Sequence, residues 1–139
     1  MTARLIPELE VDDLDVSIAF YTGILGCTVL YARPEERFVF LELEGANLML
    51  EEAAGPGRRF HTAPLEHPFG RGVNLQIQVA DADALYARVV AAQSHVVLAM
   101  EERWYRRNDH EIGHRQFVVA DPDGYLLRFF SGLGQRPAD

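Results

Sequence analysis

Two stretches of the chain follow the same pattern, and together they decide its fold. The first is Val11-Asp12-Asp13-Leu14-Asp15-Val16-Ser17-Ile18-Ala19-Phe20-Tyr21, and the second is Val79-Ala80-Asp81-Ala82-Asp83-Ala84-Leu85-Tyr86-Ala87-Arg88-Val89. Each begins where an apolar strand ends, continues with an acidic residue suited to cap a helix, and then becomes an amphipathic helix. The two stretches lie about half of the 139 residues apart. This spacing predicts an internal duplication, whose halves can face each other across a cavity.

Alternation of apolar and polar residues predicts the strands of each half. In the first half we expect a helix from Asp13 to about Leu25 and strands at 5–11, 28–32, 38–43 and 46–52. In the second half we expect a helix from Asp81 to about Ala92 and strands at 73–79, 95–100, 116–120 and 125–130. The polar stretch 101–113 and the segment after Gly132 are expected to be a loop and a tail, and 121–124 a turn without a catalytic role.

The expected fold class is α+β, with two tandem βαβββ modules that form curved mixed sheets around a cavity. We expect one domain over residues 1–139. Module one spans about 4–53, a linker rich in glycine and proline spans about 54–71, and module two spans about 72–131.

Composition limits the partners of the chain. The net charge is −8 and the pI is near 5.0, which disfavours nucleic acid as a partner. No apolar run is long enough to span a bilayer, and the N-terminus lacks a signal-peptide pattern. The single cysteine, Cys27, cannot form an intramolecular disulfide and is expected in the core. A cytoplasmic location is therefore expected.

Two motifs carry a resemblance to a known family. They are Val11-Asp12-Asp13-Leu14-Asp15-Val16-Ser17-Ile18-Ala19-Phe20-Tyr21-Thr22-Gly23-Ile24-Leu25-Gly26 and Gln116-Phe117-Val118-Val119-Ala120-Asp121-Pro122-Asp123-Gly124-Tyr125-Leu126-Leu127-Arg128-Phe129. With them the chain resembles the vicinal oxygen chelate superfamily, which includes glyoxalase I, extradiol dioxygenases, fosfomycin-resistance enzymes and bleomycin-resistance proteins.

The resemblance also implies where a metal would be held. The family places ligands in the first and last strands of each half, and here those positions hold Ile6, Glu51, Asn74 and Arg128, with Glu51 uncertain by a residue or two. Isoleucine has no donor atom, and arginine brings a positive charge where a cation should sit. These residues do not suit a divalent ion, and no metal or other cofactor is expected.

The remaining resemblance is to the bleomycin-resistance branch, through Leu48–Glu51, Trp104–Arg106 and Gly113–Phe117. It implies a homodimer that binds and sequesters an antibiotic-like small molecule of bleomycin type and catalyses no reaction. In one interpretation this ligand is cationic. The expected ligand-binding residues are Glu8, Phe38, Phe40, Glu51, Asn74, Gln76, Trp104, Tyr105 and Arg128. Arg128 is expected to pair with a carboxylate, and the aromatic residues either stack on the ligand or pack in the core.

The alternative is a metal-dependent glyoxalase-like or dioxygenase-like enzyme with displaced ligands. It would need at least three of the five histidines, His61, His67, His95, His110 and His114, to converge with Glu51. The run from His110 to His114 matches the H-E-x-x-H zinc motif, but that motif requires a helix. Gly113 and the strand that follows favour a polar loop instead.

Overall fold

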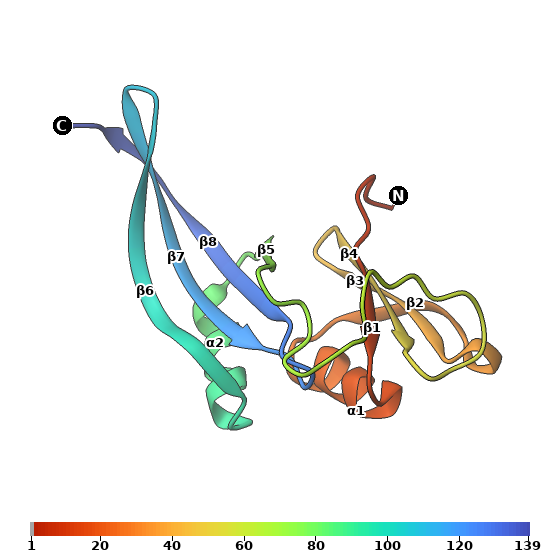
Figure 1. The fold of residues 1–139 in the computed structure, drawn as a ribbon. Helices are drawn as coiled ribbons and strands as arrows, with labels where there is room; N and C mark the ends of the chain where they lie inside the picture. The colour runs from red at the N-terminus through yellow and green to blue at the C-terminus, as the bar shows by residue number, and fades with distance from the viewer. Residues whose placement is uncertain (1) are drawn as a thin grey trace. The chain divides into compact units, whose positions relative to one another are not determined.

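The computed structural model describes residues 2–139 (Figure 1). It divides into two compact units, each built on one four-stranded mixed sheet. The first unit holds the chain up to Phe69 together with Pro122–Gly124, and the second holds Gly70–Asp121 and Tyr125–Asp139. The element order is βαβββ twice, which confirms the predicted α+β fold class and the internal duplication.

The first unit contains the elements of the first predicted module. They are β1 (Glu8–Val11), α1 (Leu14–Ile18), the π-helix η1 (Ala19–Ile24), β2 (Thr28–Arg33), the 3-10 helix η2 (Pro34–Glu36), β3 (Phe38–Leu43) and β4 (Ala46–Glu52). The strand order is β1-β4-β3-β2, with β1 parallel to β4 and the other pairs antiparallel. The predicted limits of β3 and β4 are confirmed, and the predicted helix continues beyond α1 as η1.

Local sequence explains where these elements begin and end. The Asp13 side chain accepts hydrogen bonds from the backbone N–H groups of Asp15 and Val16, so it caps α1 as predicted. Glu44 and Gly45 both have positive φ, 48° and 91°, which matches the tight hairpin expected between β3 and β4.

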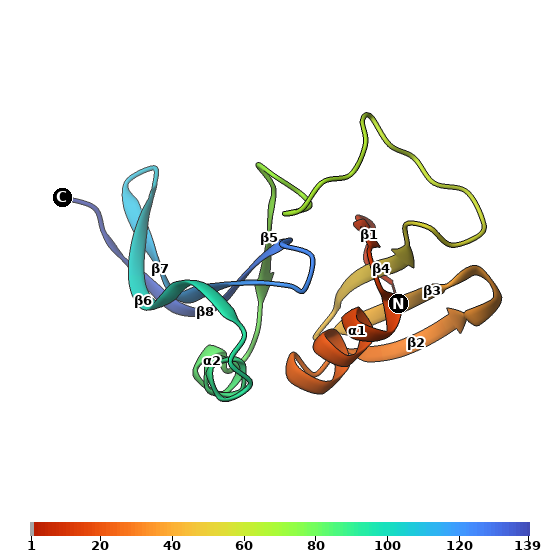
Figure 2. The same ribbon diagram turned by 60° about the horizontal axis from the view of Figure 1, so that its bottom comes forward.

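The two faces of the first sheet differ in composition. Leu9, Leu50 and Val39 occupy one row across β1, β4 and β3 and are buried. On the other face the register aligns Glu10 with Glu51, and Glu51 in turn with Phe38. The connecting segment 53–69 runs along the side of this sheet away from α1 (Figure 2). The first sheet therefore has an apolar face and a second face that carries carboxylates and aromatic rings.

The second unit repeats the arrangement with longer strands. Its elements are β5 (Asn74–Gln78), α2 (Ala82–Ala91), β6 (His95–Arg107), β7 (His110–Ala120) and β8 (Leu126–Pro137), in the order β5-β8-β7-β6. Asp81 caps α2 by accepting from the Ala84 N–H. Leu85 and Val89 of α2 are buried, and the Tyr86 ring lies 5.1 Å from that of Phe117 on β7.

Two predictions for this unit were wrong. The polar stretch 101–113 is not a loop, because β6 and β7 form a long antiparallel hairpin through it. The segment after Gly132 is not a tail, because β8 continues to Pro137 and pairs with His110. Both extensions are stabilised by residues far apart in sequence, such as the Arg136 guanidinium 4.2 Å from the Trp104 ring centroid. Within residues 2–139, no helix is long and apolar enough to cross a membrane.

Candidate ligand-binding site

Three carboxylates gather on the second face of the first sheet. Glu10 and Glu51 are neighbours in the β1–β4 register, and Glu51 shares a hydrogen bond with Glu8. The connecting segment supplies nitrogen partners: the Arg59 Nη1 atom lies 3.0 Å from a Glu51 oxygen, and the His61 Nε2 atom lies 2.5 Å from a Glu10 oxygen. We call Glu8, Glu10 and Glu51 the acidic cluster.

The acidic cluster changes the acidity of Glu51, which is only 6% exposed. Burial, followed by the hydrogen bond and charge of Glu8, raises the pKa of Glu51 from 4.5 to about 7, while the Arg59 guanidinium opposes the shift. The carboxylate therefore ionises near neutral pH. Three carboxyl groups face one guanidinium and one imidazole, so the cluster is net negative when Glu51 is ionised.

Aromatic rings cover the neighbouring part of the same face. The Tyr31 ring stacks on Phe40 with centroids 4.8 Å apart, and the Arg33 guanidinium lies 3.9 Å from the Phe38 ring centroid. Phe38 and Phe40 are 3% and 2% exposed, so both pack in the interior, while Tyr31 is exposed. The structure thus brings four expected site residues, Glu8, Phe38, Phe40 and Glu51, to one face.

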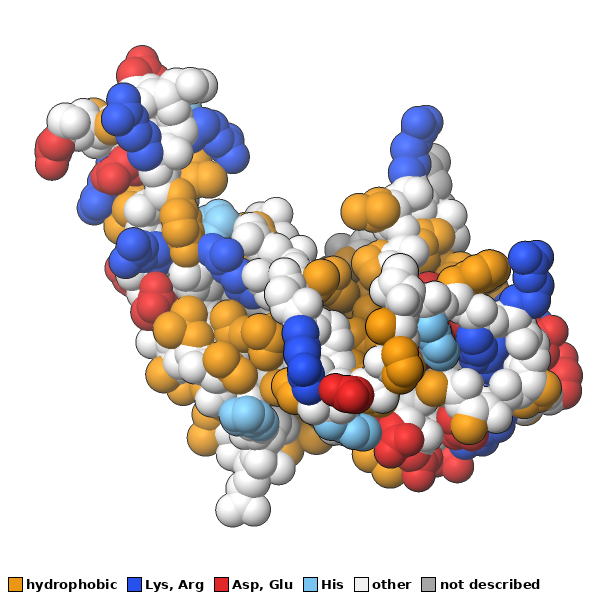
Figure 3. Space-filling view, in the orientation of Figure 1, with side chains coloured by type: hydrophobic (Ala, Val, Ile, Leu, Met, Phe, Trp, Pro, Cys, Tyr) orange, Lys and Arg blue, Asp and Glu red, His pale blue; other side chains and the backbone are white. Residues whose placement is uncertain are grey.

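The second unit has a hollow of about 400 Å³ on one face of its sheet. Its lining residues are Asn74, Val97, Leu98, Glu101, Arg103, Tyr105, Gln116, Val118, Leu126 and Arg128. Hydrophobic side chains gather over the lower part of β6–β8 and arginines over their far end (Figure 3). The expected site residues Asn74, Tyr105 and Arg128 meet in this hollow, and the exposed Gln76 is the register neighbour of Arg128 on β5.

Arg128 has different partners from those expected. Its Nε and Nη2 atoms donate to the Gln116 side-chain oxygen at 3.2 and 3.0 Å, and Nη2 also donates to the Tyr105 hydroxyl at 2.6 Å. The predicted ion pair with a carboxylate is therefore wrong. Glu101 joins the network through the Gln116 amide, which donates to it at 3.3 Å.

Trp104 lies outside this hollow. Adjacent residues of a strand point to opposite faces, so Trp104 and Tyr105 cannot both line it. Trp104 pairs with Gly113 on β7 and packs against Arg136 of β8. Its role in ligand binding, expected from the sequence, gains no support from this position.

The strand register corrects the position equivalent to Arg128 in the first half. Gln76 and Glu8 each lie three residues before the valine that ends the first strand of their half. Gln76 pairs with Arg128, and Glu8 pairs with Met49. Met49, rather than Glu51, therefore holds the equivalent place. The four positions that the resemblance implies for metal ligands are then Ile6, Met49, Asn74 and Arg128. This set has no carboxylate or imidazole and does not fit a hard divalent ion.

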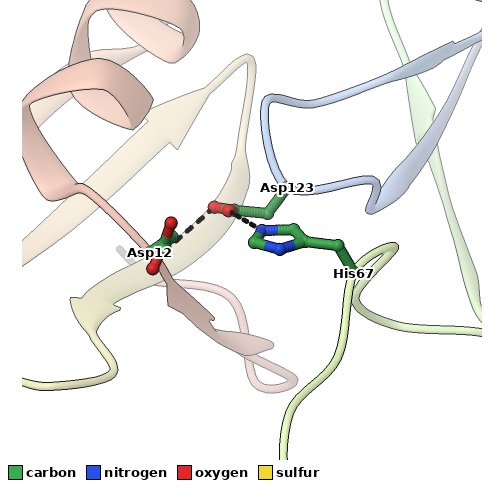
Figure 4. A group of neighbouring side chains, drawn as sticks. All are labelled: Asp12, His67 and Asp123. Carbon is green, nitrogen blue, oxygen red and sulfur yellow. Dashed lines mark hydrogen bonds and ion pairs between the residues drawn. The ribbon is translucent and has the colours of Figure 1, made fainter.

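The histidines do not supply a replacement set. Within residues 2–139, the one group of three metal-ligating side chains with mutually close donor atoms is Asp12, His67 and Asp123, which excludes Glu51 (Figure 4). In that group Asp123 is buried, one of its oxygens lies 3.0 Å from the His67 Nε2 atom, and the other accepts the Asp12 N–H at 3.2 Å. Both oxygens are already engaged, which favours a hydrogen-bond anchor over a metal centre.

Sequence reasoning missed several of these residues. Arg59 and His61 belong to a segment without periodicity. The sequence predicts Gln116 only as the start of a strand and Asp123 only as part of a turn. The many arginine, histidine and glutamate residues in the segment 58–67 could have pointed to Arg59 and His61. The contact of Gln116 with Arg128 depends on the register between β7 and β8, which the sequence does not show.

The chain is similar to known proteins over nearly its whole length. Residues 6–129 match the family model described as the Glyoxalase/Bleomycin resistance protein/Dioxygenase superfamily. A protein named bleomycin resistance protein from Geobacillus stearothermophilus is 29% identical over 135 residues, which cover 92% of this chain and 96% of that protein.

Solved structures agree on the fold. The structure of TioX from Micromonospora sp. ML1 is similar with a TM-score of 0.74 and 21% identity, covering 94% of this chain and 99% of that one. A protein of unknown function from Agrobacterium tumefaciens has a TM-score of 0.66 and 25% identity, covering 96% and 97%. The family match, the duplicated βαβββ order and the two mixed sheets lead to one conclusion: the chain belongs to the glyoxalase/bleomycin resistance protein/dioxygenase superfamily.

Proposed function

We propose that this protein binds and sequesters a small, cationic, amphipathic molecule of bleomycin type, without a metal and without turnover. The acidic cluster carries this proposal, because the buried Glu10 and Glu51 and the exposed Glu8 attract a cation. The exposed ring of Tyr31, stacked on Phe40, offers a surface for a flat apolar part. The similarity to a bleomycin resistance protein over almost the full length of both chains supports it. The position set Ile6, Met49, Asn74 and Arg128 argues against the metal-dependent alternative.

Arg59 already occupies part of the acidic cluster. Its guanidinium lies between Glu51, at 3.0 Å, and Glu10, at 4.0 Å. A cationic ligand therefore has to share these carboxylates with Arg59 or displace it. Because Arg59 belongs to the connecting segment rather than to a strand, the displacement needs no change in the sheet.

Isothermal titration with metal-free bleomycin in EDTA tests the proposal. We expect saturable binding that is tighter at pH 8 than at pH 6, because Glu51 becomes ionised between these values. Glu51→Gln should lower the affinity at pH 8 roughly tenfold, the equivalent of one strong charged contact. Glu35→Gln, a change at an exposed glutamate of η2, is the matched control and should bind like the wild type. Absence of binding, or equal loss in both variants, contradicts the proposal.

We also propose a homodimer in the cytoplasm. The edge strand β2 exposes Val29, Leu30 and Tyr31 in succession, which favours contact with another surface. The lone buried Cys27 suits a reducing compartment. Sedimentation velocity should give the mass of two chains, and a single 15.7 kDa species across the micromolar range would contradict the dimer.

A further inference from the structure

The hollow of the second unit contains a fixed network of donors. Arginine can only donate hydrogen bonds, so the Gln116 side chain must turn its oxygen toward Arg128. Its amide nitrogen then donates to the Tyr105 hydroxyl oxygen at 2.6 Å and to Glu101 at 3.3 Å. The orientation of Gln116 is therefore determined by Arg128, and Gln116 in turn fixes the guanidinium.

Two donors of this network remain unused. The Tyr105 oxygen accepts from both Arg128 and Gln116, so its own O–H has to donate to a third group. Within residues 2–139 that hydroxyl hydrogen has no acceptor, and the Nη1 atom of Arg128 has no hydrogen-bond partner. Both side chains are only half-buried and line the hollow, so the donors are accessible to a ligand.

A buried histidine packs against the network. The His114 ring stacks on Phe130 with centroids 4.0 Å apart and meets the edge of Tyr105 at 5.4 Å. Burial, together with the charges of Arg128 and Arg107, lowers the pKa of His114, so the ring stays neutral. It holds Tyr105 in place without adding a charge.

The hollow combines an apolar wall with a charge balance opposite to that of the whole chain. Among the lining residues, Arg103 and Arg128 are positive and Glu101 is the single acid, whereas the chain has a net charge of −8. Val97, Leu98, Val118 and Leu126 supply the apolar wall. A hollow of about 400 Å³ suits a bicyclic ring with one polar group.

We infer that this hollow is a binding site for a carboxylate carried on an apolar or aromatic body. Arg128 Nη1 and the Tyr105 hydroxyl would donate to the carboxylate oxygens, and the apolar wall would cover the ring. The site lies wholly within the second unit, uses none of the acidic cluster, and goes beyond the cation binding proposed above.

The test compares 1-naphthoate with 1-naphthalenemethanol, which has the same ring but no charge, by isothermal titration of the full chain near pH 8. We expect the wild type to bind naphthoate at least ~10-fold more tightly than the alcohol. Arg128→Met should abolish this preference while the alcohol still binds. Tyr105→Phe should weaken naphthoate binding by roughly threefold to tenfold through loss of one hydrogen bond.

Arg115→Gln is the control, because Arg115 lies on the opposite face of β7 and pairs with the exposed Asp83. It should behave like the wild type. Equal binding of the two probes by the wild type, or a preference that survives in Arg128→Met, would overturn the inference. If Arg128→Met does not fold by circular dichroism, an unchanged naphthoate affinity in Tyr105→Phe would overturn it as well.

A parallel titration with metal-free bleomycin separates this inference from the proposed function. Binding of bleomycin without any preference for naphthoate would reject the carboxylate site and leave the cation site standing. A preference for naphthoate without binding of bleomycin would support the carboxylate site and reject the cation site.

Discussion

The Arg59 guanidinium lies 3.0 Å from the Glu51 carboxylate, and both side chains are about nine-tenths buried. This pair differs from an ordinary buried ion pair because Glu8 and Glu10 surround the same carboxylate. Their charges and the burial outweigh the attraction of Arg59, so the pKa of Glu51 is raised rather than lowered. The result is a carboxyl group that changes its charge close to neutral pH.

The first prediction concerns stability and pH. Between pH 4.5, the ordinary pKa of Glu51, and about 7, its pKa in the fold, the folded chain binds more protons at this residue than the unfolded chain does. The free energy of unfolding should therefore fall as pH rises through that interval. Glu51→Gln removes this pH-dependent contribution, so the variant should gain about 3 kcal/mol in its free energy of unfolding relative to the wild type between pH 4.5 and 8. Urea unfolding at several pH values measures it, with Glu35→Gln as the control, and parallel pH profiles for wild type and Glu51→Gln would contradict it.

The second prediction concerns the Asp123 anchor. Asp123→Ala removes the acceptor for His67 and for the Asp12 N–H, and we expect a loss of about 1–3 kcal/mol in the free energy of unfolding. His67→Ala should cost less, because the His67 side chain is 53% exposed and water can replace its contact. Denaturant titration of both variants gives the comparison. A larger loss for His67→Ala would show that the anchor has been assigned to the wrong residue.

The third prediction concerns the long hairpin of the second unit. A Cβ atom at Gly113 would lie 2.8 Å from two ring atoms of Trp104 and 2.9 Å from the Leu133 Cβ, closer than packed side chains allow. Gly113→Ala should therefore destabilise the chain by about 1–3 kcal/mol and shift the fluorescence of Trp104, the single tryptophan. Gly23→Ala is the control, since nothing lies within 4 Å of its Cβ position and its stability should be kept. An unshifted emission spectrum in Gly113→Ala would contradict the packing of Trp104 described above.

The fourth prediction concerns Cys27. The thiol is 8% exposed, and burial together with the charge of Glu42 raises its pKa to about 12. The thiolate is the reactive form, so the native chain should react with Ellman's reagent near pH 8 only at the rate of unfolding. In concentrated guanidinium chloride one thiol per chain should react at once. Rapid reaction of the native protein would show that Cys27 is accessible.

Local signals in the sequence were enough for much of the fold. Asp13 and Asp81 act as helix caps because capping depends on residues two or three positions away, and the limits of β3 and β4 follow from their own alternation. The pairing of strands that lie far apart in the sequence cannot be predicted from such local patterns. The extension of β8 to Pro137 depends on β7, to which no local pattern in the tail points.

The candidate site likewise combines residues that local patterns predict with contacts that depend on long-range strand pairing. Glu8, Phe38, Phe40 and Glu51 were each expected near the ligand, and the register of β1, β4 and β3 brings the four to one face. The partners of Arg128 were missed, because register shifts in β6 near Val96, Leu98 and Glu101 determine which residues face the hollow. A one-residue shift moves every following side chain to the other face. The pairing of Glu8 with Met49 shows that Glu51 is not the equivalent of Arg128.

Equilibrium dialysis of the EDTA-treated protein against metal-free bleomycin, followed by mass spectrometry of the recovered ligand, tests the central claim most directly. The account predicts saturation at a fixed ratio of ligand to chain, retention that weakens in Glu51→Gln, and recovery of the ligand with its mass unchanged. Retention only after a divalent metal is restored, or recovery of a chemically altered ligand, would contradict it.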